Sequence, residues 1–421
     1  MDLLLILMAM PGHVFFWAAL VNRVHAIGIP RFLVNFLTVA GFAFMAALPL
    51  GLAVLAWRQP GILASFARTA ATYAVGTEHS SRLATLYVVF CLVVGAGNVA
   101  RLVHRRFRPA SLALVDGETI RELSSDEMAS AGAGLAADAP PTAPAQSHQQ
   151  QGLAAARPAR EHHRLTGLPG NEILRLRVVS RQLRLPHWPR ELDELAIVHV
   201  SDLHFTGRVG KDYFRRLVAE IGALRPDLVT ITGDLVDSRA AIDWIGELLA
   251  PIRAAYGVYA ILGNHDRRAG ERAVRAALDR AGIIDLGGRW LQILVRGRPL
   301  ILAGNELPWF VPAADLRDCP PRAAPSGPPR IGLAHTPDQL DWACANEFDL
   351  LLAGHTHGGQ ICLPLVGPLF VPSIVGVRYA AGVFGRGPTV LHVTRGVSGE
   401  LPVRWNCPPE IVRLVVRCPK P

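Results

Sequence analysis

The sequence of 421 residues has little charge and lacks the cysteine spacing of common metal sites. Only 18% of its residues are charged, whereas half are hydrophobic. Its six cysteines include no Cys-x-x-Cys pair, which argues against a thiolate zinc site or an iron–sulfur cluster. We therefore expect free thiols. Cys407 and Cys418, which flank the last predicted strand, would pair only if this part of the chain were exported.

Other features are missing as well. The chain begins Met1-Asp2 without a positive segment and shows no small-residue cleavage site, so a cleaved secretory signal is not expected. The net charge is +9, but the arginines are scattered and no aromatic-basic recognition motif is present. This pattern argues against nucleic-acid binding. It favours attraction to anionic lipid headgroups or to phosphate substrates.

Long apolar stretches dominate the first quarter of the chain. Three of them approach or exceed the roughly 20 residues that a helix needs to cross a bilayer core. Their few polar residues include His13, Asn35 and Asn98, which we expect to form hydrogen bonds between helices. We predict a transmembrane region over 1–108 with helices at 3–20, 32–57 and 83–100.

Basic residues predict the orientation of these helices. Four arginines crowd the end of the third stretch, and the positive-inside rule then places the domain that follows in the cytoplasm. The weaker apolar stretch Gly61–Gly76, interrupted by Arg68, is either an interfacial segment or a fourth span. Both alternatives predict a multi-pass protein of the inner or cell membrane with a cytoplasmic C-terminal domain. The four arginines are Arg101, Arg105, Arg106 and Arg108.

The segment 109–166 differs from what precedes and follows it. Its central part is rich in Ala, Pro, Ser and Gln and has almost no large apolar side chains. Such a composition cannot bury enough surface to offset the entropy lost on ordering. We predict a disordered linker over 109–166, which lets a domain at 167–421 approach the bilayer surface.

The domain at 167–421 repeats one pattern, in which a short apolar run is followed at once by Asp, Asn or His. Such runs are typical of strands buried on both faces, and ligands gather at the carboxyl ends of such strands. Amphipathic segments at 211–224, 240–253 and 271–281 predict helices that cover the sheets. The runs end at Asp202-Leu203-His204, Gly233-Asp234, Gly263-Asn264-His265, His335 and Gly354-His355-Thr356-His357.

Each motif alone has a simpler structural interpretation. An Asp-x-His pair commonly caps a helix or lies on the surface, Gly-Asp commonly forms a turn, and a lone histidine such as His335 is commonly a core or surface residue. Five motifs at five strand ends favour one shared site instead.

The chemistry of the candidate ligands limits the metal. They offer nitrogen and oxygen without thiolate, which favours Mn, Fe, Zn, Ni, Co or Mg with open positions. Seven ligands are too many for one ion with a vacancy, but they suit two divalent ions about 3.5–4 Å apart that share a carboxylate. The seven are Asp202, His204, Asp234, Asn264, His335, His355 and His357.

In their order and spacing, the five motifs resemble those of the calcineurin-like metallophosphoesterase superfamily, over roughly 174–416. The resemblance implies a four-layer α/β/β/α metallophosphoesterase sandwich, here preceded by the α-helical transmembrane region. It implies that Asp234 bridges two metals. It further assigns Asp202, His204, Asp234 and His357 to the first metal, and Asn264, His335 and His355 to the second.

The same resemblance implies that His265 is the general acid that protonates the leaving group, and that Asp237 orients it. In the protein phosphatases of the superfamily an arginine follows this carboxylate. Here the position is Ser238, which argues against a protein phosphatase. Asp266 is expected to fix the turn rather than take part in chemistry.

The continuation Gly358-Gly359-Gln360 is similar to that of bacterial membrane-associated phosphodiesterases, a branch that includes UDP-diacylglucosamine pyrophosphatases. This implies a membrane-anchored hydrolase of phosphodiester or pyrophosphate bonds, with a lipid-linked or nucleotide-containing substrate. The alternatives are a phosphomonoesterase and a catalytically silent membrane regulator that keeps the fold. The complete ligand set argues against the silent regulator. The sequence leaves the oligomeric state open.

Overall fold

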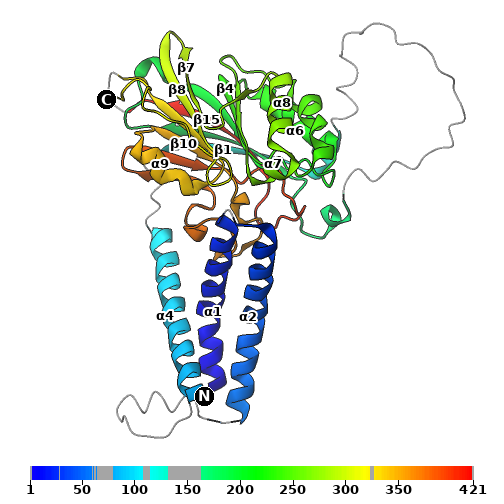
Figure 1. Ribbon diagram of the computed structural model, residues 1–421, viewed down its shortest axis with the longest axis vertical. Helices are drawn as coiled ribbons and strands as arrows, with labels where there is room; N and C mark the ends of the chain where they lie inside the picture. Colours follow the sequence, from blue (N-terminus) through cyan, green and yellow to red (C-terminus); the bar gives the residue numbers. More distant parts are fainter. Residues whose placement is uncertain are drawn as a thin grey trace, which may run out of the picture. The chain divides into compact units, whose positions relative to one another are not determined.

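The computed structural model describes residues 2–27, 29–58, 60, 63, 79–107, 114–130, 163–322 and 327–419. The chain divides into two compact units (Figure 1). The helical unit comprises Met1–Ala110 and Leu363–Arg378, and the catalytic unit comprises Ser111–Cys362 and Tyr379–Pro421. All six cysteines lie in the described ranges and are free thiols.

Among the described residues, three long helices belong to the helical unit: α1 (Asp2–Ala26), α2 (Arg31–Arg58) and α4 (His79–Phe107). Each contains one of the predicted stretches, and each is long and apolar enough to cross a membrane. The prediction of three such helices is therefore confirmed. The weaker stretch at 61–76 lies outside the described residues, apart from Leu63.

Small and polar residues set the packing of these helices. A Cβ atom at Gly12 of α1 would lie 1.7 Å from the carbonyl oxygen of Cys91 in α4, so only glycine permits this approach. His13 contacts the hydroxyl of Tyr87 at 2.5 Å through Nδ1 and the carbonyl of Met45 at 2.9 Å through Nε2. The interhelical bond predicted for His13 is thus confirmed. The one predicted for Asn98 is wrong, because its amide donates within α4 to the carbonyl four residues earlier.

Seven strands form the first sheet of the catalytic unit. Strands β3 to β6 are parallel neighbours, and the last strand of the chain, β15, runs antiparallel to β3. Across the sheet they run β1 (Val115–Leu123), β2 (Leu176–Arg184), β15 (Glu410–Arg417), β3 (Leu195–Val200), β4 (Leu228–Thr232), β5 (Val258–Ile261) and β6 (Ile284–Asp285).

Six strands form the second sheet, with parallel pairing inside and antiparallel pairing at both edges. Their order is β13 (Gly382–Arg386), β14 (Thr389–Val393), β10 (Leu350–Ala353), β9 (Arg330–Ala334), β8 (Arg298–Asn305) and β7 (Trp290–Val295). The two sheets pack face to face through a buried apolar core that includes Ile197, Ile261, Leu302, Leu333 and Leu352.

Helices cover the outer faces of both sheets (Figure 1). Helices α6 (Lys211–Ala223) and α8 (Glu271–Arg280) pack their apolar faces on the first sheet, and α9 (Leu340–Ala345) packs on the second. The α/β/β/α prediction is therefore confirmed. The helix predicted at 240–253 is instead a 3₁₀ turn, Arg239–Ala241, followed by a short π-helix, Ile245–Leu249.

The prediction of a disordered linker over 109–166 is wrong for its first part. Val115–Leu123 is strand β1, which pairs antiparallel with β2, and helix α5 (Ser125–Ser130) follows it. The Ala, Pro, Ser and Gln-rich composition belongs to the central part of the segment, whereas β1 lies before it and pairs through its backbone. Leu123 and Met128, each 2% exposed, suffice to join the core. Residues 131–162 lie outside the described residues.

A second boundary also differs from the prediction. The expected domain at 167–421 is interrupted, because Leu363–Arg378 belongs to the helical unit. This interruption contains β12 (Gly367–Pro368), which pairs with β11 (Cys362–Leu363) in a two-stranded sheet. The pairing of this segment with distant helices could not be predicted from local sequence.

Candidate metal centre

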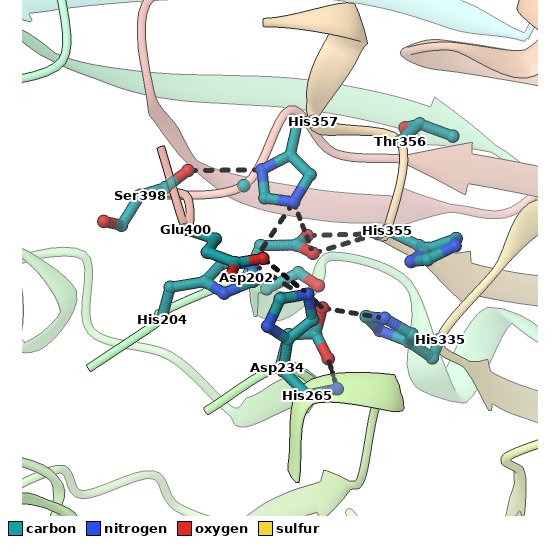
Figure 2. Close-up of polar contacts among 12 residues, drawn as sticks. Asp202, His204, Asp234, His265, His335, His355, Thr356, His357, Ser398 and Glu400 are labelled. Carbon is teal, nitrogen blue, oxygen red and sulfur yellow. Dashed lines mark hydrogen bonds and ion pairs between the residues drawn. The ribbon is translucent and has the colours of Figure 1, made fainter. Parts of the chain in front are cut away.

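The residues predicted to form the site meet at the carboxyl ends of strands from both sheets (Figure 2). Parallel strands end at the same edge of a sheet, so residues distant in sequence come together there. In the first sheet, β3 precedes Asp202 and His204, β4 precedes Asp234, and β5 precedes Asn264 and His265. In the second sheet, β9 precedes His335, and β10 precedes His355 and His357.

Five of these residues adopt the left-handed backbone region that side chains normally avoid. Their φ values are 57° for Asp202, 45° for His204, 52° for Asp234, 69° for His355 and 51° for His357. This conformation costs on the order of 1 kcal/mol for each residue. Such strain collects where the surrounding fold holds side chains for function.

Two glycines let the carboxylates approach the neighbouring chain. A Cβ atom at Gly354 would lie 2.6 Å from Oδ2 of Asp202, and one at Gly263 would lie 2.3 Å from Oδ1 of Asp234. The geometry of the site therefore requires glycine at both positions.

One group of donors consists of Asp202, His204, Asp234 and His357, whose ligand atoms lie within 4.8 Å of one another. Nε2 of His204 lies 3.2 Å from Nε2 of His357, and the latter lies 3.5 Å from Oδ1 of Asp202. Oδ2 of Asp234 lies 3.6 Å from Nε2 of His204. Two imidazole nitrogens and two carboxylates thus point at one small space.

A second group consists of Asp234, His335 and His355. Nε2 of His335 lies 3.2 Å from Oδ2 of Asp234 and 3.2 Å from Oδ1 of Asn264. Asp234 therefore belongs to both groups, and the Asn264 amide oxygen faces the second one. All seven predicted ligands are brought together.

Hydrogen bonds at the far side of the rings orient the donors. Nδ1 of His335 contacts the carbonyl of Thr232 at 2.7 Å, and Nδ1 of His357 contacts the carbonyl of Ser398 at 3.2 Å. A carbonyl accepts only from N–H, so in the neutral form of each ring the lone pair lies on Nε2. Nε2 of His355 is buried and has no hydrogen-bond partner among the described residues. These oriented nitrogen and oxygen donors, together with a buried nitrogen that lacks a hydrogen-bond partner, are suitable ligands for divalent ions.

Asp237 serves two histidines at once. Its carboxylate forms a short contact with Nδ1 of His265, and both its oxygens lie 3.1 Å from Nδ1 of His204. The backbone N–H of His265 donates to Oδ1 of Asp234 at 2.8 Å. The pairing of Asp237 with His265 was predicted, whereas its contact with the candidate ligand His204 was not.

The structure also adds residues that the motifs did not identify. Glu400 lies 3.8 Å from Nε2 of His265 and 3.6 Å from Nη1 of Arg268. Arg404 is fully buried and donates to the carbonyls of His357 and Ser398, which holds the turn that carries His357. Glu400 is more than 130 positions from His265, and Arg404 is 47 positions from His357, so no spacing pattern indicates these contacts.

Burial and charge act in opposite directions on the carboxylates. Burial raises the pKa of Asp234, but the facing His335 and His265 outweigh it and hold that pKa well below its usual range. Burial likewise raises the pKa of Asp237, yet His204 and His265 lower it overall. Both carboxylates are therefore ionised at neutral pH.

Asp266 has a different environment. Burial and the neighbouring Asp234 charge raise its pKa to about 7. Its oxygens accept hydrogen bonds from the backbone N–H groups of Leu235, Val236 and Gly263. Its expected part in fixing the turn is confirmed by these bonds.

Comparison with known proteins gives several similarities to this chain. Residues 195–359 match the family described as calcineurin-like phosphoesterase. Phosphodiesterase YaeI of Escherichia coli (strain K12) is 33% identical over 223 residues, covering 52% of this chain and 80% of that protein. UDP-2,3-diacylglucosamine pyrophosphatase LpxG of Chlamydia muridarum (strain MoPn / Nigg) is 26% identical over 299 residues, covering 58% and 89%. A Danio rerio transmembrane protein with metallophosphoesterase domain is 27% identical over 256 residues, covering 57% of each chain.

Proposed function

Since the chain belongs to the calcineurin-like phosphoesterase family and is a metal-dependent phosphoester hydrolase, we propose that it is a membrane-anchored phosphodiesterase or pyrophosphatase with two divalent ions. The observation that carries the proposal is the pair of donor groups that share Asp234. When bound, two ions held by these groups would activate a water molecule and neutralise phosphate charge.

The ligand assignment follows from the two groups. Asp202, His204 and His357 bind the first ion together with Asp234. The second ion is bound by Asp234 and by Asn264, His335 and His355. Mixed nitrogen and oxygen donors without thiolate suit Mn, Fe, Zn, Ni, Co or Mg.

His265 acts as the general acid for the leaving group. Its Nδ1 faces the Asp237 carboxylate, which accepts a hydrogen bond from Nδ1–H and orients the ring. Its Nε2 then holds the proton that an alkoxide leaving group requires. Asp237 also fixes His204, so one carboxylate positions the acid and a metal ligand together.

The proposed substrate is a phosphodiester or pyrophosphate that is lipid-linked or contains a nucleotide. Similarity to a phosphodiesterase and to a UDP-2,3-diacylglucosamine pyrophosphatase supports this class. The three apolar helices support anchoring in the cell membrane, and the arginines at 101–108 favour a cytoplasmic catalytic unit.

The full-length protein in detergent tests the proposal. With Mn²⁺, we expect bis-p-nitrophenyl phosphate to be hydrolysed with a higher kcat/KM than p-nitrophenyl phosphate. Elemental analysis is expected to give two ions per chain. A preference for the monoester would favour a phosphomonoesterase, one ion per chain would contradict the dinuclear centre, and inactivity with every divalent metal would contradict the hydrolase mechanism itself.

A further inference from the structure

The segment Leu363–Arg378 differs in composition from the rest of the catalytic sequence. From Leu363 to Val377 it carries no charged residue, and Ser373 is its only polar side chain. It begins six residues after His357, so the chain leaves the metal turn and enters this apolar segment almost at once.

The segment packs within the helical unit. The Asn22 amide of α1 donates to the carbonyl of Leu369 at 3.0 Å, and its oxygen accepts from the N–H of Val371 at 2.9 Å. The ring of Phe370 lies 5.3 Å from that of Phe42 in α2. Asn22 is only 3% exposed, so both of its hydrogen-bonding groups are used on this segment.

The position of Asn22 along α1 sets the level of the contact. The next residue is Arg23, which is exposed and is the first charged side chain after the apolar run of the helix. In a helix that crosses a bilayer, the first charged residue marks the boundary between hydrocarbon and headgroups. A segment bonded to Asn22 therefore lies at that boundary.

Several apolar side chains of the segment face outward. Leu365 is 93% exposed, and Leu363 and Val375 are 44% and 43% exposed. Leu365 lies between the paired strands β11 and β12, in the left-handed region with φ of 66°. Exposed apolar side chains that gather in one short segment mark an interaction surface.

We propose that Leu363–Arg378 is an interfacial segment that inserts its apolar side chains into the bilayer surface, as a second membrane contact besides the three helices. The bilayer is the occupant because the same helical unit presents Phe36 and Val39 outward, at 68% and 69% exposure. The inference rests on the proposed membrane anchoring.

Photocrosslinking in the full chain tests this inference. We place p-benzoylphenylalanine at Leu365 in protein reconstituted into phospholipid nanodiscs and detect adducts by mass spectrometry. The matched control is Leu294, which is 64% exposed on β7 of the catalytic unit, and the positive control is Phe36 on α2. We expect lipid adducts at 365 to be about tenfold more abundant than at 294.

The controls separate two kinds of failure. Suppose that lipid adducts form at position 36, but that adducts at position 365 are no more abundant than those at position 294. This result would overturn the interfacial segment and leave the membrane anchoring intact. Absence of lipid adducts at 36 would overturn the anchoring and the segment together. Adducts at 365 with another copy of the protein in place of lipid would identify a protein interface and overturn the bilayer as occupant.

Activity provides an independent readout. Methyl and hexadecyl p-nitrophenyl phosphate share one leaving group and differ only in the alkyl chain. Leu365→Asp is expected to lower kcat/KM about tenfold for the hexadecyl ester in nanodiscs and to leave the methyl ester unchanged, because a leucine no longer enters the apolar phase. Equal losses with both esters would overturn the proposed role.

Discussion

The two units differ in where their apolar side chains lie. In the helical unit Phe36 and Val39 point outward, and the few buried polar side chains, such as His13, are hydrogen-bonded. In the catalytic unit strands such as β4 and β10 are buried along their whole length. The apolar runs that are long enough to span a bilayer thus leave large side chains exposed, whereas the runs of four to six residues lie in a protein core.

The buried charge of the two units differs as well. The catalytic unit buries Asp202 and Asp234 almost completely, at 0% and 1% exposure. Buried carboxylates require compensating positive charge, which a metal centre supplies. Asp202 and Asp234 both belong to the donor groups at the strand ends, where bound metal ions would compensate their charge.

The largest expected effect, confined to the catalytic unit, comes from removing the carboxylate that both donor groups share. Asp234→Ala takes a ligand from both proposed ions, so we expect kcat/KM for bis-p-nitrophenyl phosphate to fall at least about 10⁴-fold. The variant should remain in the membrane fraction, because the helices are untouched. Asp318→Ala, at an exposed position, is the matched control and should retain full activity. Activity retained in Asp234→Ala would contradict the ligand assignment.

Truncation tests where the catalytic unit begins. A fragment of 111–421 keeps β1, whereas 167–421 loses it together with Leu123 and Met128 of the core. We expect the shorter fragment to be less stable by about 4 kcal/mol or more, because two buried apolar side chains leave the core. Chemical denaturation of both fragments measures the difference. Equal stabilities would show that β1 adds nothing to the fold.

His265→Ala sharpens the assignment within the site. We expect a loss of about 10²-fold or more with an alkyl leaving group and a smaller loss with p-nitrophenolate, which departs without a proton. Steady-state kinetics on a matched pair of diesters measures both losses. Equal losses would argue that His265 positions the substrate and does not transfer a proton.

The smallest expected effect is on the pH dependence of stability, and it comes from a buried histidine pair in the catalytic unit. Nδ1 of His199 lies 2.9 Å from Nδ1 of His392, and burial lowers the pKa of His199 to about 3. The unfolded chain binds this proton near pH 6.5 and the folded chain does not, so stability is full above pH 6.5 and falls as the pH drops. His199 alone should cost about 2 kcal/mol between pH 8 and pH 5.

Unfolding of the full chain and of His199→Gln at several pH values checks this expectation. The variant should lose less stability on acidification, since one titrating group is gone. An identical pH dependence in both proteins would mean that His199 is protonated in the folded state.

Local patterns determined much of this molecule. The three apolar stretches predicted α1, α2 and α4, and the apolar runs before Asp202, Asp234 and the later motifs predicted strands whose ends converge. These predictions held because strand and helix periods, and the placing of ligands at strand ends, are properties of a few consecutive residues. The motif order was specific enough to indicate the family.

The remaining features follow from contacts between distant parts of the chain. Strand β1 lies in a segment whose composition predicts disorder, and Leu363–Arg378 belongs with helices more than 300 residues away. The second contact of Asp237 and the role of Arg404 are equally hidden. Each feature depends on contacts between residues that are far apart in the sequence. The stabilising free energy comes from these contacts, so the neighbouring residues in the chain do not indicate the feature. Local sequence indicated the phosphoesterase family and the order of elements, whereas long-range packing determined which segments support the site.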